Sequence, residues 1–507
     1  MARTLIPQDW GLQTEAGGAL LVGGFRAVDL AREFGTPLHV LNEARLEETA
    51  SHFRQSLEAA YPGRAAVHYA FKCNSVPAVV ASVRRAGLKA EVMSEFELEL
   101  ALKLGYAGEE IIVNGPGKTD QFLLQCLRAN VRLIIVDSLS ELQALGRIAG
   151  AQHREVDILF RINPDYVPRG LNSGTATASR KGCAFGLDLK AGEPQAALAA
   201  LRDIIWVRFR GYHFHIGTGI RDPREYSRAL ERLAPLIRET RAAGRRVGVV
   251  DVGGGFASMT TRELTTREFL VYQGFERLPS GLPREDDAAF ADFAGVISGA
   301  LLRIFPANEL PELIAEPGRS IASPNQLLLL TVHRVKERPG VRKWLITDGG
   351  LGTVTLPTFY EYHEVFLADE VTRPRTEKVT IIGPVCFASD IVYRNKWMPC
   401  IRPGEVLAIM DSGAYFTAQE SSFGFARPAV VAVNRNGCRL VRRRESYEDM
   451  VSRDDTGIPF YGSSDFLVGI HEDRVKFPPL RKGGCKGNRF LGFYSPLTPP
   501  FKRRGTA

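Results

Sequence analysis

The chain lacks the cysteine and histidine spacings that hold structural metals or disulfide frameworks. Its seven cysteines are scattered and odd in number, no two of them form a C-x-x-C pair, and the nine histidines include no H-E-x-x-H motif. Metal-binding and disulfide-stabilised domains carry such spacings as their signature. The sequence therefore predicts reduced thiols and no metal site.

Long hydrophobic runs are also missing. No stretch of about 18 apolar residues occurs, as a membrane-spanning helix would need, and residues 1–9 lack the apolar core of a signal peptide. We therefore expect a cytoplasmic protein with no membrane segment. With 507 residues, 45% of them hydrophobic and 24% charged, the chain is long enough for two globular domains.

Excess positive charge is confined to one end of the chain. The net charge is +8, but residues 471–507 alone hold nine Lys or Arg and two Asp or Glu, so the preceding 470 residues are nearly neutral. The same tail is rich in proline and glycine, which predicts an irregular extension. It leaves an acidic partner open, but a nucleic-acid-binding domain is not expected.

Short β-type apolar runs alternate with longer segments of helical period between about residues 45 and 325, and this pattern predicts repeated βα units. One helix is expected over Ser94–Leu104 and another over Ser138–Ile148, where Ser138 and Glu141 form an S-x-x-E capping box. Eight βα units predict a TIM barrel. The eight apolar runs are Val67–Phe71, Ala90–Met93, Ile111–Val113, Leu133–Val136, Asp157–Ile162, Gly211–Phe214, Val249–Val252 and Leu313–Ala315.

A second, mostly antiparallel β domain is expected after the barrel, because strand-like stretches there are separated by Gly, Pro and Asn. These stretches are 327–335, 343–347, 378–382, 406–410 and 429–433. Residues 36–41 are also strand-like and are expected to join this domain. The predicted organisation is an N-terminal segment at 1–44, a barrel at 45–325, a β domain at 326–450 and a basic extension at 451–507.

Active sites of such barrels lie at the C-terminal ends of the strands. Lys72 follows the first apolar run, and burial there would lower its pKa and provide the neutral amine that captures an aldehyde as a Schiff base. The other strands end in polar residues or glycine as well. Loops are commonly polar, but this set of residues at one end of the barrel favours a shared functional site. The residues that follow the eight runs are Lys72, Ser94, Asn114, Asp137, Asn163, His215, Gly253 and Glu316.

Three further features favour pyridoxal 5′-phosphate (PLP) as the cofactor. Gly253, Gly254 and Gly255 follow the seventh run, where barrels of this kind usually bind phosphate. Glu316 ends the eighth run, and a carboxylate there can hold the protonated pyridine nitrogen. His215 ends the sixth run, and its ring can lie flat on a cofactor.

These motifs resemble those of the fold-type III PLP-dependent decarboxylases, the group that includes the diaminopimelate and ornithine decarboxylases and shares the alanine-racemase-like barrel. The resemblance runs from about Gly35 to Val433. The segments that carry it are Tyr69–Asn74, Glu91–Ser94 with Glu97, Val136–Ser138, Arg161–Pro164, His213–Thr218, Asp251–Phe256, Glu316–Arg319, Gly383–Cys386 with Asp390, and Gly413–Tyr415.

The resemblance implies roles for individual residues. Lys72 is the Schiff-base lysine, and His215 stacks on the pyridine ring that Glu316 pairs with. Cys386 resembles the cysteine that the partner subunit supplies as a proton donor, which implies a homodimer with shared sites. The cofactor-binding set is Lys72, His215, Thr218, Gly254, Gly255, Glu316, Gly318, Arg319 and Tyr415, and the expected substrate-binding residues are Arg161, Arg319, Tyr360, Phe387 and Asp390.

Two departures from the family pattern concern the substrate. Phe387 stands where the family has an acidic residue for the distal amino group, and Leu356 stands where the diaminopimelate enzymes have an arginine for a distal carboxylate. Loss of charged partners removes recognition of a charged substrate end. We therefore expect an amino acid other than ornithine or free diaminopimelate, with Arg180, Lys181 or Tyr360 contacting its distal group.

The leading prediction is thus a PLP-dependent α-decarboxylase of an amino acid or of an amino-acid-derived intermediate. Diaminopimelate decarboxylase, a PLP-dependent racemase and a non-catalytic PLP-fold binding protein remain the alternatives. A racemase is less favoured because racemases of related fold place an arginine, not a carboxylate such as Glu316, at the ring nitrogen.

Overall fold

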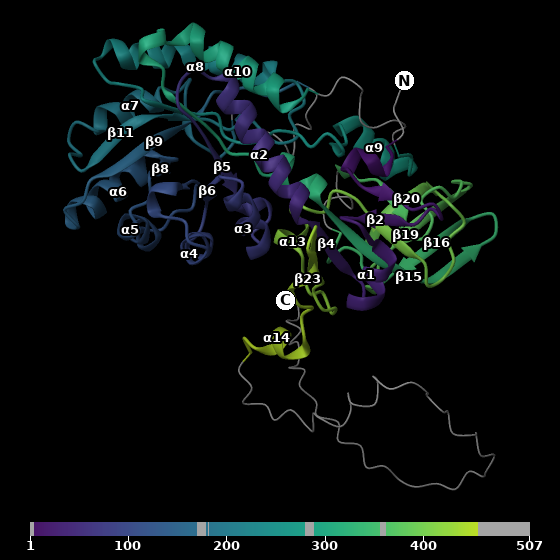
Figure 1. Ribbon diagram of the computed structural model, residues 1–507. Coiled ribbons are helices and arrows are strands. Elements are labelled where there is room, and N and C mark those ends of the chain that lie inside the picture. The colour runs from purple at the N-terminus through teal and green to yellow at the C-terminus, as the bar shows by residue number, and fades with distance from the viewer. Residues whose placement is uncertain (1–4, 170–178, 181, 279–287, 355–360, 455–507) are drawn as a thin grey trace, which may run out of the picture. The chain divides into compact units, whose positions relative to one another are not determined.

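The computed structural model describes residues 5–169, 179–180, 182–278, 288–354 and 361–454. The chain divides into two compact units, Met1–Met450 and Val451–Ala507. Nearly all described elements belong to the first unit (Figure 1).

Eight parallel strands form a closed barrel in the first unit. Neighbouring strands pair in chain order, and the ring closes where β14 pairs with β5. Each strand overlaps one of the eight apolar runs, so the predicted barrel is confirmed. The strands are β5 (Ala65–Ala70), β6 (Lys89–Val92), β7 (Ile111–Val113), β8 (Leu133–Val136), β9 (Val156–Asn163), β11 (Val207–His213), β12 (Val249–Asp251) and β14 (Glu312–Ala315).

Helices surround these strands (Figure 1). Side chains cap the N-termini of some of them: at one of these, the Ser138 hydroxyl accepts from the Glu141 N–H at 3.2 Å, and the Glu141 carboxylate accepts from the Asp137 N–H. The same arrangement recurs at Ser94 and Glu97. The helices are α2 (Glu43–Ala60), α3 (Pro77–Arg85), α4 (Glu95–Lys103), α5 (Asp120–Arg128), α6 (Leu139–Ala151), α7 (Glu193–Ala200), α8 (Arg224–Ala242) and α10 (Phe290–Ile304).

The interior of the barrel is apolar at one level and polar at another. Seven buried aliphatic side chains from six of the strands form a hydrophobic cluster of their own. Polar side chains occupy the C-terminal ends of the strands, where the loops begin. The apolar layer is Ala66, Ile112, Leu133, Ile135, Leu159, Val249 and Ile314.

A second sheet, mostly antiparallel, follows the barrel and confirms the predicted fold class. Its centre is the long strand β15 (Gln326–Arg338), which pairs with three neighbours. The N-terminal strand β4 (Leu38–Asn42) lies between β15 and β22. The other strands are β16 (Arg342–Thr347), β18 (Val365–Leu367), β19 (Glu377–Ile382), β20 (Ile391–Met398), β21 (Val406–Ile409), β22 (Ala429–Asn434) and β23 (Gly437–Arg442).

Smaller elements complete the unit and connect the two parts. The two-residue strands β13 (Arg262–Glu263) and β17 (Glu361–Tyr362) pair with each other and so join the segment after β12 to the second domain. The other short strands and helices are β1 (Gln13–Thr14), β2 (Leu20–Val22), β3 (Phe25–Arg26), β10 (Leu187–Asp188), α1 (Ala27–Phe34), α9 (Thr266–Phe275), α11 (Arg319–Ala322), α13 (Phe416–Gln419) and α14 (Tyr447–Val451).

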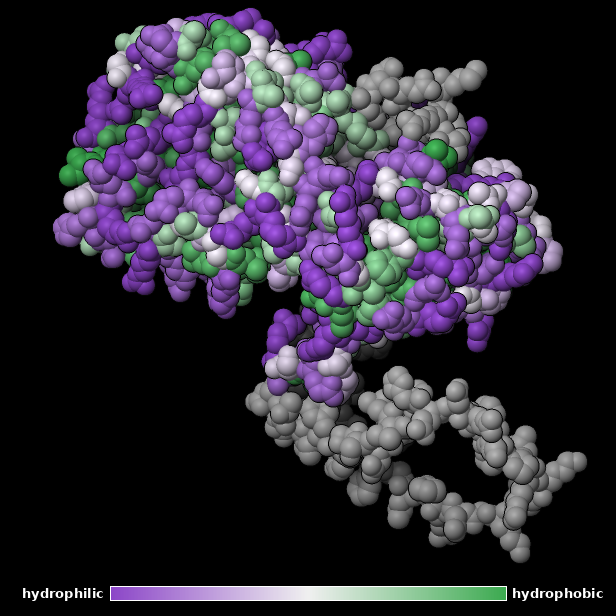
Figure 2. Space-filling model, in the orientation of Figure 1, coloured by the Kyte–Doolittle hydropathy of each residue, from purple (hydrophilic) through white to green (hydrophobic). Residues whose placement is uncertain are grey.

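The face of the molecule drawn in Figure 2 is predominantly hydrophilic, with hydrophobic residues in separate patches. Over the ranges that the structure describes, every helix is too short or too polar to traverse a lipid bilayer. The predicted domain limits at residues 44, 325 and 450 remain a proposal.

Candidate active site

Each barrel strand carries one polar side chain at or near its C-terminal end, and these eight side chains contact one another in three sets. Most of these side chains are almost fully buried, Lys72 being the exception with 32% of its side chain exposed. The members are Lys72, Glu91, Asn114, Asp137, Arg161, His213, Asp251 and Glu316. Each is the last residue of its strand or lies within two or three residues of that end, as barrel geometry dictates.

Lys72 lies in a single 3₁₀ turn, Phe71–Cys73, directly after β5. Its ammonium donates to the Glu91 carboxylate at 2.6 Å. Burial disfavours the charged amine, but the nearby carboxylates of Glu91 and Glu316 outweigh it and raise the pKa of Lys72 above its usual range. The expectation that burial would leave a neutral amine is therefore wrong: to act as the predicted nucleophile, Lys72 would have to pass its proton on, and Glu91 lies within reach of it.

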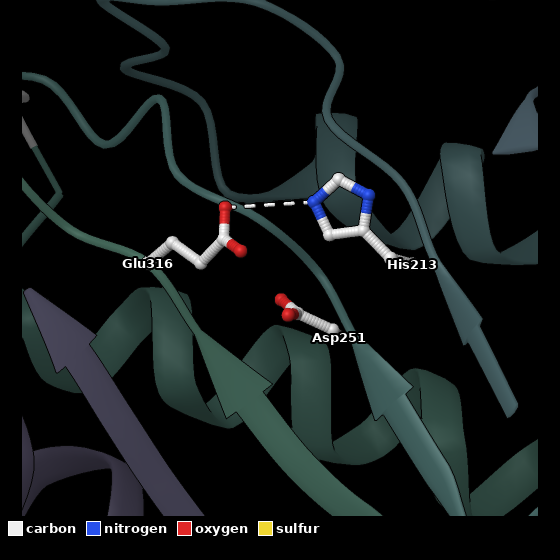
Figure 3. A group of neighbouring side chains, drawn as sticks. All are labelled: His213, Asp251 and Glu316. Carbon is white, nitrogen blue, oxygen red and sulfur yellow. Dashed lines mark ion pairs between the residues drawn. The ribbon is translucent and has the colours of Figure 1, made fainter. Parts of the chain in front are cut away.

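Glu316 follows β14 and is 3% exposed. The Asn114 amide donates to both of its oxygens at 3.4 Å, and the His213 Nε2 lies 3.5 Å from Oε2 (Figure 3). Burial and the charge of Arg161 hold the pKa of His213 well below its usual range, so this imidazole is neutral. Glu316 thus sits at the centre of the mouth with polar neighbours on two sides.

His215 and the glycine triplet form one wall. The Gly254 N–H donates to Nδ1 of His215 at 3.2 Å, which fixes the imidazole ring beside the triplet. A Cβ on Gly254 would lie 2.4 Å from the Glu316 carbonyl oxygen, and one on Gly255, where φ is +99°, would lie 2.2 Å from that of Gly217. Only glycine fits either position, because the backbone segments approach each other so closely.

Arg319, Thr218 and Tyr415 lie together at the rim. The Arg319 guanidinium donates to the Thr218 hydroxyl at 3.3 Å and lies 5.1 Å from the centre of the Tyr415 ring. Tyr415 is brought to the lysine loop by its own N–H, which donates to the Cys73 carbonyl at 2.8 Å. Arg319 also pairs with Glu361 at 2.6 Å, a partner that the sequence did not reveal.

The loop between β19 and β20 holds the remaining predicted residues. Cys386 is exposed, and Phe387 is 48% exposed with its ring 6.1 Å from that of Phe423. Both Asp390 oxygens accept backbone N–H groups, from Leu351 at 2.5 Å and from Val385 at 2.7 Å. Asp390 therefore holds this loop in place, and its predicted contact with substrate is not favoured by this geometry.

Arg161 lies inside the mouth, 3.6 Å from Asp137 and 4.5 Å from the centre of the Phe185 ring. Arg180 supplies a carbonyl oxygen to the Asn163 amide. Lys181, Leu356 and Tyr360 lie outside the described residues, so their predicted roles at the substrate's distal end have no structural account.

Sequence reasoning missed Glu91, His213 and Asp251 as members of the site. It inspected the residue after each apolar run, whereas β11 and β12 end one residue before those runs do, at His213 and Asp251, and Glu91 lies inside β6. The site residue therefore lies three positions before the inspected one on β6 and two positions before it on β11 and β12. A polar residue at the end of an otherwise apolar strand is the signal that would have revealed all three.

The residues present fit PLP. Lys72 offers an amine for its aldehyde, Glu316 a buried carboxylate for its ring nitrogen, and the neutral His215 ring a flat neighbour. The glycine loop leaves space that side chains would fill, and Arg319 and Thr218 add a cation and a hydroxyl for a phosphate.

Comparison with known proteins agrees with this chemistry. Residues 43–323, more than half of the chain, match the pyridoxal-binding domain of pyridoxal-dependent decarboxylases. The diaminopimelate decarboxylase of Methanocaldococcus jannaschii is 29% identical over 442 residues, covering 86% of this chain and 95% of that protein. That of Mycobacterium tuberculosis is 30% identical over 467 residues, covering 88% and 98%.

Solved structures give the same result. The crystal structure of the M. jannaschii diaminopimelate decarboxylase superposes with a TM-score of 0.79 at 27% sequence identity, covering 89% of this chain and 99% of that one. A second structure of that enzyme, in complex with L-lysine, superposes with a TM-score of 0.78.

These relatives correct the substrate prediction. From Phe387 and Leu356 we expected an amino acid other than free diaminopimelate, yet proteins that match along most of the chain are diaminopimelate decarboxylases. The exclusion was wrong because it judged recognition of a whole substrate from two positions, one of which lies outside the described residues.

The barrel, the lysine at the end of its first strand and the carboxylate at the end of its last agree with the match over residues 43–323. The chain therefore belongs to the pyridoxal-dependent decarboxylase family and is a PLP-dependent carboxy-lyase of amino-acid metabolism.

Proposed function

We propose that this chain is a diaminopimelate decarboxylase, which removes one carboxylate of diaminopimelate to leave lysine. The similarity to enzymes of that name over 86–88% of the chain carries the proposal. The complete set of Lys72, Glu91, His215 and Glu316 around one mouth supports it, since these groups match what the reaction requires.

In this proposal Lys72, His215, Thr218, Gly254, Gly255, Glu316, Gly318, Arg319 and Tyr415 hold PLP. When bound, its pyridinium ring accepts the electron pair that departure of CO₂ leaves on Cα. Glu316, as a carboxylate, holds a proton on the ring nitrogen and so preserves that capacity. The His215 ring limits the movement of the cofactor, because Gly254 fixes its orientation.

In this proposal Glu91 accepts the proton of the Lys72 ammonium. The Lys72 ammonium is not nucleophilic, and the Glu91 oxygen 2.6 Å away is the nearest acceptor for its proton. Burial raises the pKa of Glu91, which makes this carboxylate a better base than an exposed one. Glu91 can hold the proton while the amine reacts and return it when the amine is released.

The reprotonation of Cα is assigned to Cys386 of a second subunit. Cys386 and Phe387 are exposed on this protomer, as residues that complete a partner's site would be. The proposal therefore includes a homodimer in which each mouth is completed by the other chain's β19–β20 loop. In this proposal Phe387 offers the substrate an apolar contact. The guanidinium groups of Arg161 and Arg319 would bind the distal carboxylate of the substrate.

The test measures CO₂ release by the PLP-loaded protein from meso-diaminopimelate, L-lysine, L-ornithine and L-arginine. We expect diaminopimelate to give the highest kcat/KM, and a Lys72→Ala variant to lose the absorbance of lysine-bound PLP together with activity. Preference for ornithine or arginine would contradict the proposed substrate. Exchange of the α-hydrogen without CO₂ release would contradict decarboxylation of this panel.

A further inference from the structure

Asp251 is the last residue of β12 and lies beside His213 and Glu316. It is 0% exposed, and its Oδ1 accepts the Gly253 N–H at 2.8 Å. Its Oδ2 is buried with no hydrogen-bond partner among the described residues. Figure 3 shows the Asp251 carboxyl directed toward Glu316 and His213, and the ligand-capable atoms of these three residues lie within 4.8 Å of one another.

Two carboxylates that share a buried space cannot both remain charged. The surrounding strand ends add to the excess of negative charge, because Glu91 and Asp137 also face this space. Opposite them stand two cations, Lys72 and Arg161. Burial keeps both His213 and His215 neutral by lowering the pKa of each well below its usual range. This excess of negative charge in a buried space favours a proton shared between Asp251 and Glu316, whose pKa values are both raised by burial.

The neighbours of the two carboxyls decide where that proton resides. Burial raises the pKa of Glu316 as well, but the charges of Lys72 and Arg161 and two contacts from the Asn114 amide oppose this and favour its ionised form. Asp251 receives a single N–H, from Gly253. Burial, followed by the charge of Glu316, raises the pKa of Asp251 well above its usual range.

We propose that Asp251 is a protonated acid at neutral pH and that its Oδ2–H donates to the Glu316 carboxylate. Asp251 is then a positioning residue, which acts on the cofactor through Glu316. This rests on the proposed pairing of Glu316 with the ring nitrogen. Without the donor, Glu316 would itself take up a proton more readily and would no longer be an acceptor for the ring N–H.

The same side chain connects two parts of the cofactor site. Oδ1 holds the first N–H of the Gly253–Gly255 turn, while Oδ2–H holds the carboxylate at the ring nitrogen. Asp251 thereby fixes the distance between the Gly253–Gly255 turn, proposed to bind the phosphate, and Glu316, proposed to bind the ring nitrogen. An asparagine could make both contacts, with its amide oxygen and its NH₂, whereas an alanine could make neither.

Infrared spectroscopy of the PLP-loaded protein without substrate tests the proton directly. At about pH 9, where the Glu263 carboxyl with its pKa of about 8 is largely ionised, we expect a protonated-carboxyl band that shifts in D₂O. The band should move when aspartate is ¹³C-labelled and disappear in Asp251→Asn, while a Glu263→Gln control retains it. Absence of an aspartate band, or its persistence in Asp251→Asn, would overturn the proposal. Asp251→Ala gives the same readout if Asp251→Asn does not fold.

Kinetics distinguish a positioning role from a structural one. Asp251→Asn should keep kcat within about threefold of the wild type, because its amide still donates to Glu316. Asp251→Ala should lower kcat about tenfold or more and move the acidic limb of its pH profile to higher pH. Equal losses in both variants with unmoved profiles, or one equivalent of tightly bound metal in the purified protein, would refute the assignment. The infrared result is independent of which substrate the enzyme prefers, so failure of the diaminopimelate proposal leaves it intact.

Discussion

The charge of Lys72 depends on its contact with Glu91. The two groups lie 2.6 Å apart, and Glu91 is fully buried whereas Lys72 is about one-third exposed. Burial alone would lower the pKa of the lysine, but the Glu91 and Glu316 carboxylates raise it. The identity of this lysine could be predicted from its place at a strand end. Its protonation state could not, because Glu91 reaches it from another strand.

Replacing Glu91 by glutamine should therefore make Lys72 a better nucleophile at moderate pH. Loss of an opposite charge at this distance lowers a lysine pKa by roughly 1–3 units. We expect the pH midpoint for capture of PLP by the cofactor-free protein to fall in Glu91→Gln by a shift of that order. Stopped-flow absorbance across a pH series measures it. Glu99→Gln, at an exposed helix pair with Lys103, is the matched control and should leave the midpoint unchanged.

Glu263 provides a residue-level prediction for stability. Both its oxygens are buried without hydrogen-bond partners among the described residues, and it is directly opposite Glu361 in the β13–β17 pair. Burial, then the charge of Glu361, raises the pKa of Glu263 to about 8. The folded protein thus keeps a proton that the unfolded chain releases near pH 4.5.

The free energy of unfolding should consequently decline as pH rises from about 4.5 to about 8, because only the unfolded state ionises this group in that window. The contribution is at most on the order of 1 kcal/mol per pH unit. Glu263→Gln should flatten this part of the pH dependence. Urea unfolding at several pH values checks it, and an unchanged slope in the variant would show that Glu263 is not the group responsible.

At the level of secondary-structure elements, the positions of the strands could be predicted from the sequence. Which residues point into the barrel could be predicted for only some of the strands. Runs such as Ile111–Val113 and Leu133–Val136 coincide with β7 and β8, since fully buried parallel strands are continuously apolar. Which end residue points inward depends on where pairing begins. The predicted runs end at Phe214 and Val252, one residue beyond the ends of β11 and β12, and this is why His213 and Asp251 were overlooked.

The loop between β19 and β20 is held in place by Asp390. Asp390, 2% exposed, accepts the N–H groups of Leu351 and Val385 and so joins two loops. Asp390→Ala leaves two buried donors unpaired, which should cost about 2–4 kcal/mol of stability. Asp390→Asn retains one acceptor and should cost about half as much. Thermal unfolding ranks the three proteins, and equal stability of Asp390→Ala and the wild type would refute this role.

At the scale of the whole molecule, the role that we propose for Cys386 requires a second chain. Local patterns predicted the barrel and sheet because each strand's burial is encoded in its own residues. Completion of a site by another subunit leaves no such local pattern, since Cys386 and Phe387 simply appear exposed on this protomer. The proposed homodimer would cover this exposed loop on association.

Subunit mixing tests this arrangement. Lys72→Ala and Cys386→Ala homodimers should each be nearly inactive, because every mouth in them lacks one group. After subunit exchange, half of the dimers are mixed, and each of these contains one mouth with an intact Lys72 and an intact partner Cys386. The mixture should therefore recover about a quarter of wild-type activity. Recovery must require exchange, so a disulfide- or crosslinker-locked sample of the two homodimers is the control. No recovery after confirmed exchange would mean that Lys72 and Cys386 act within one chain or that Cys386 has no part in the reaction.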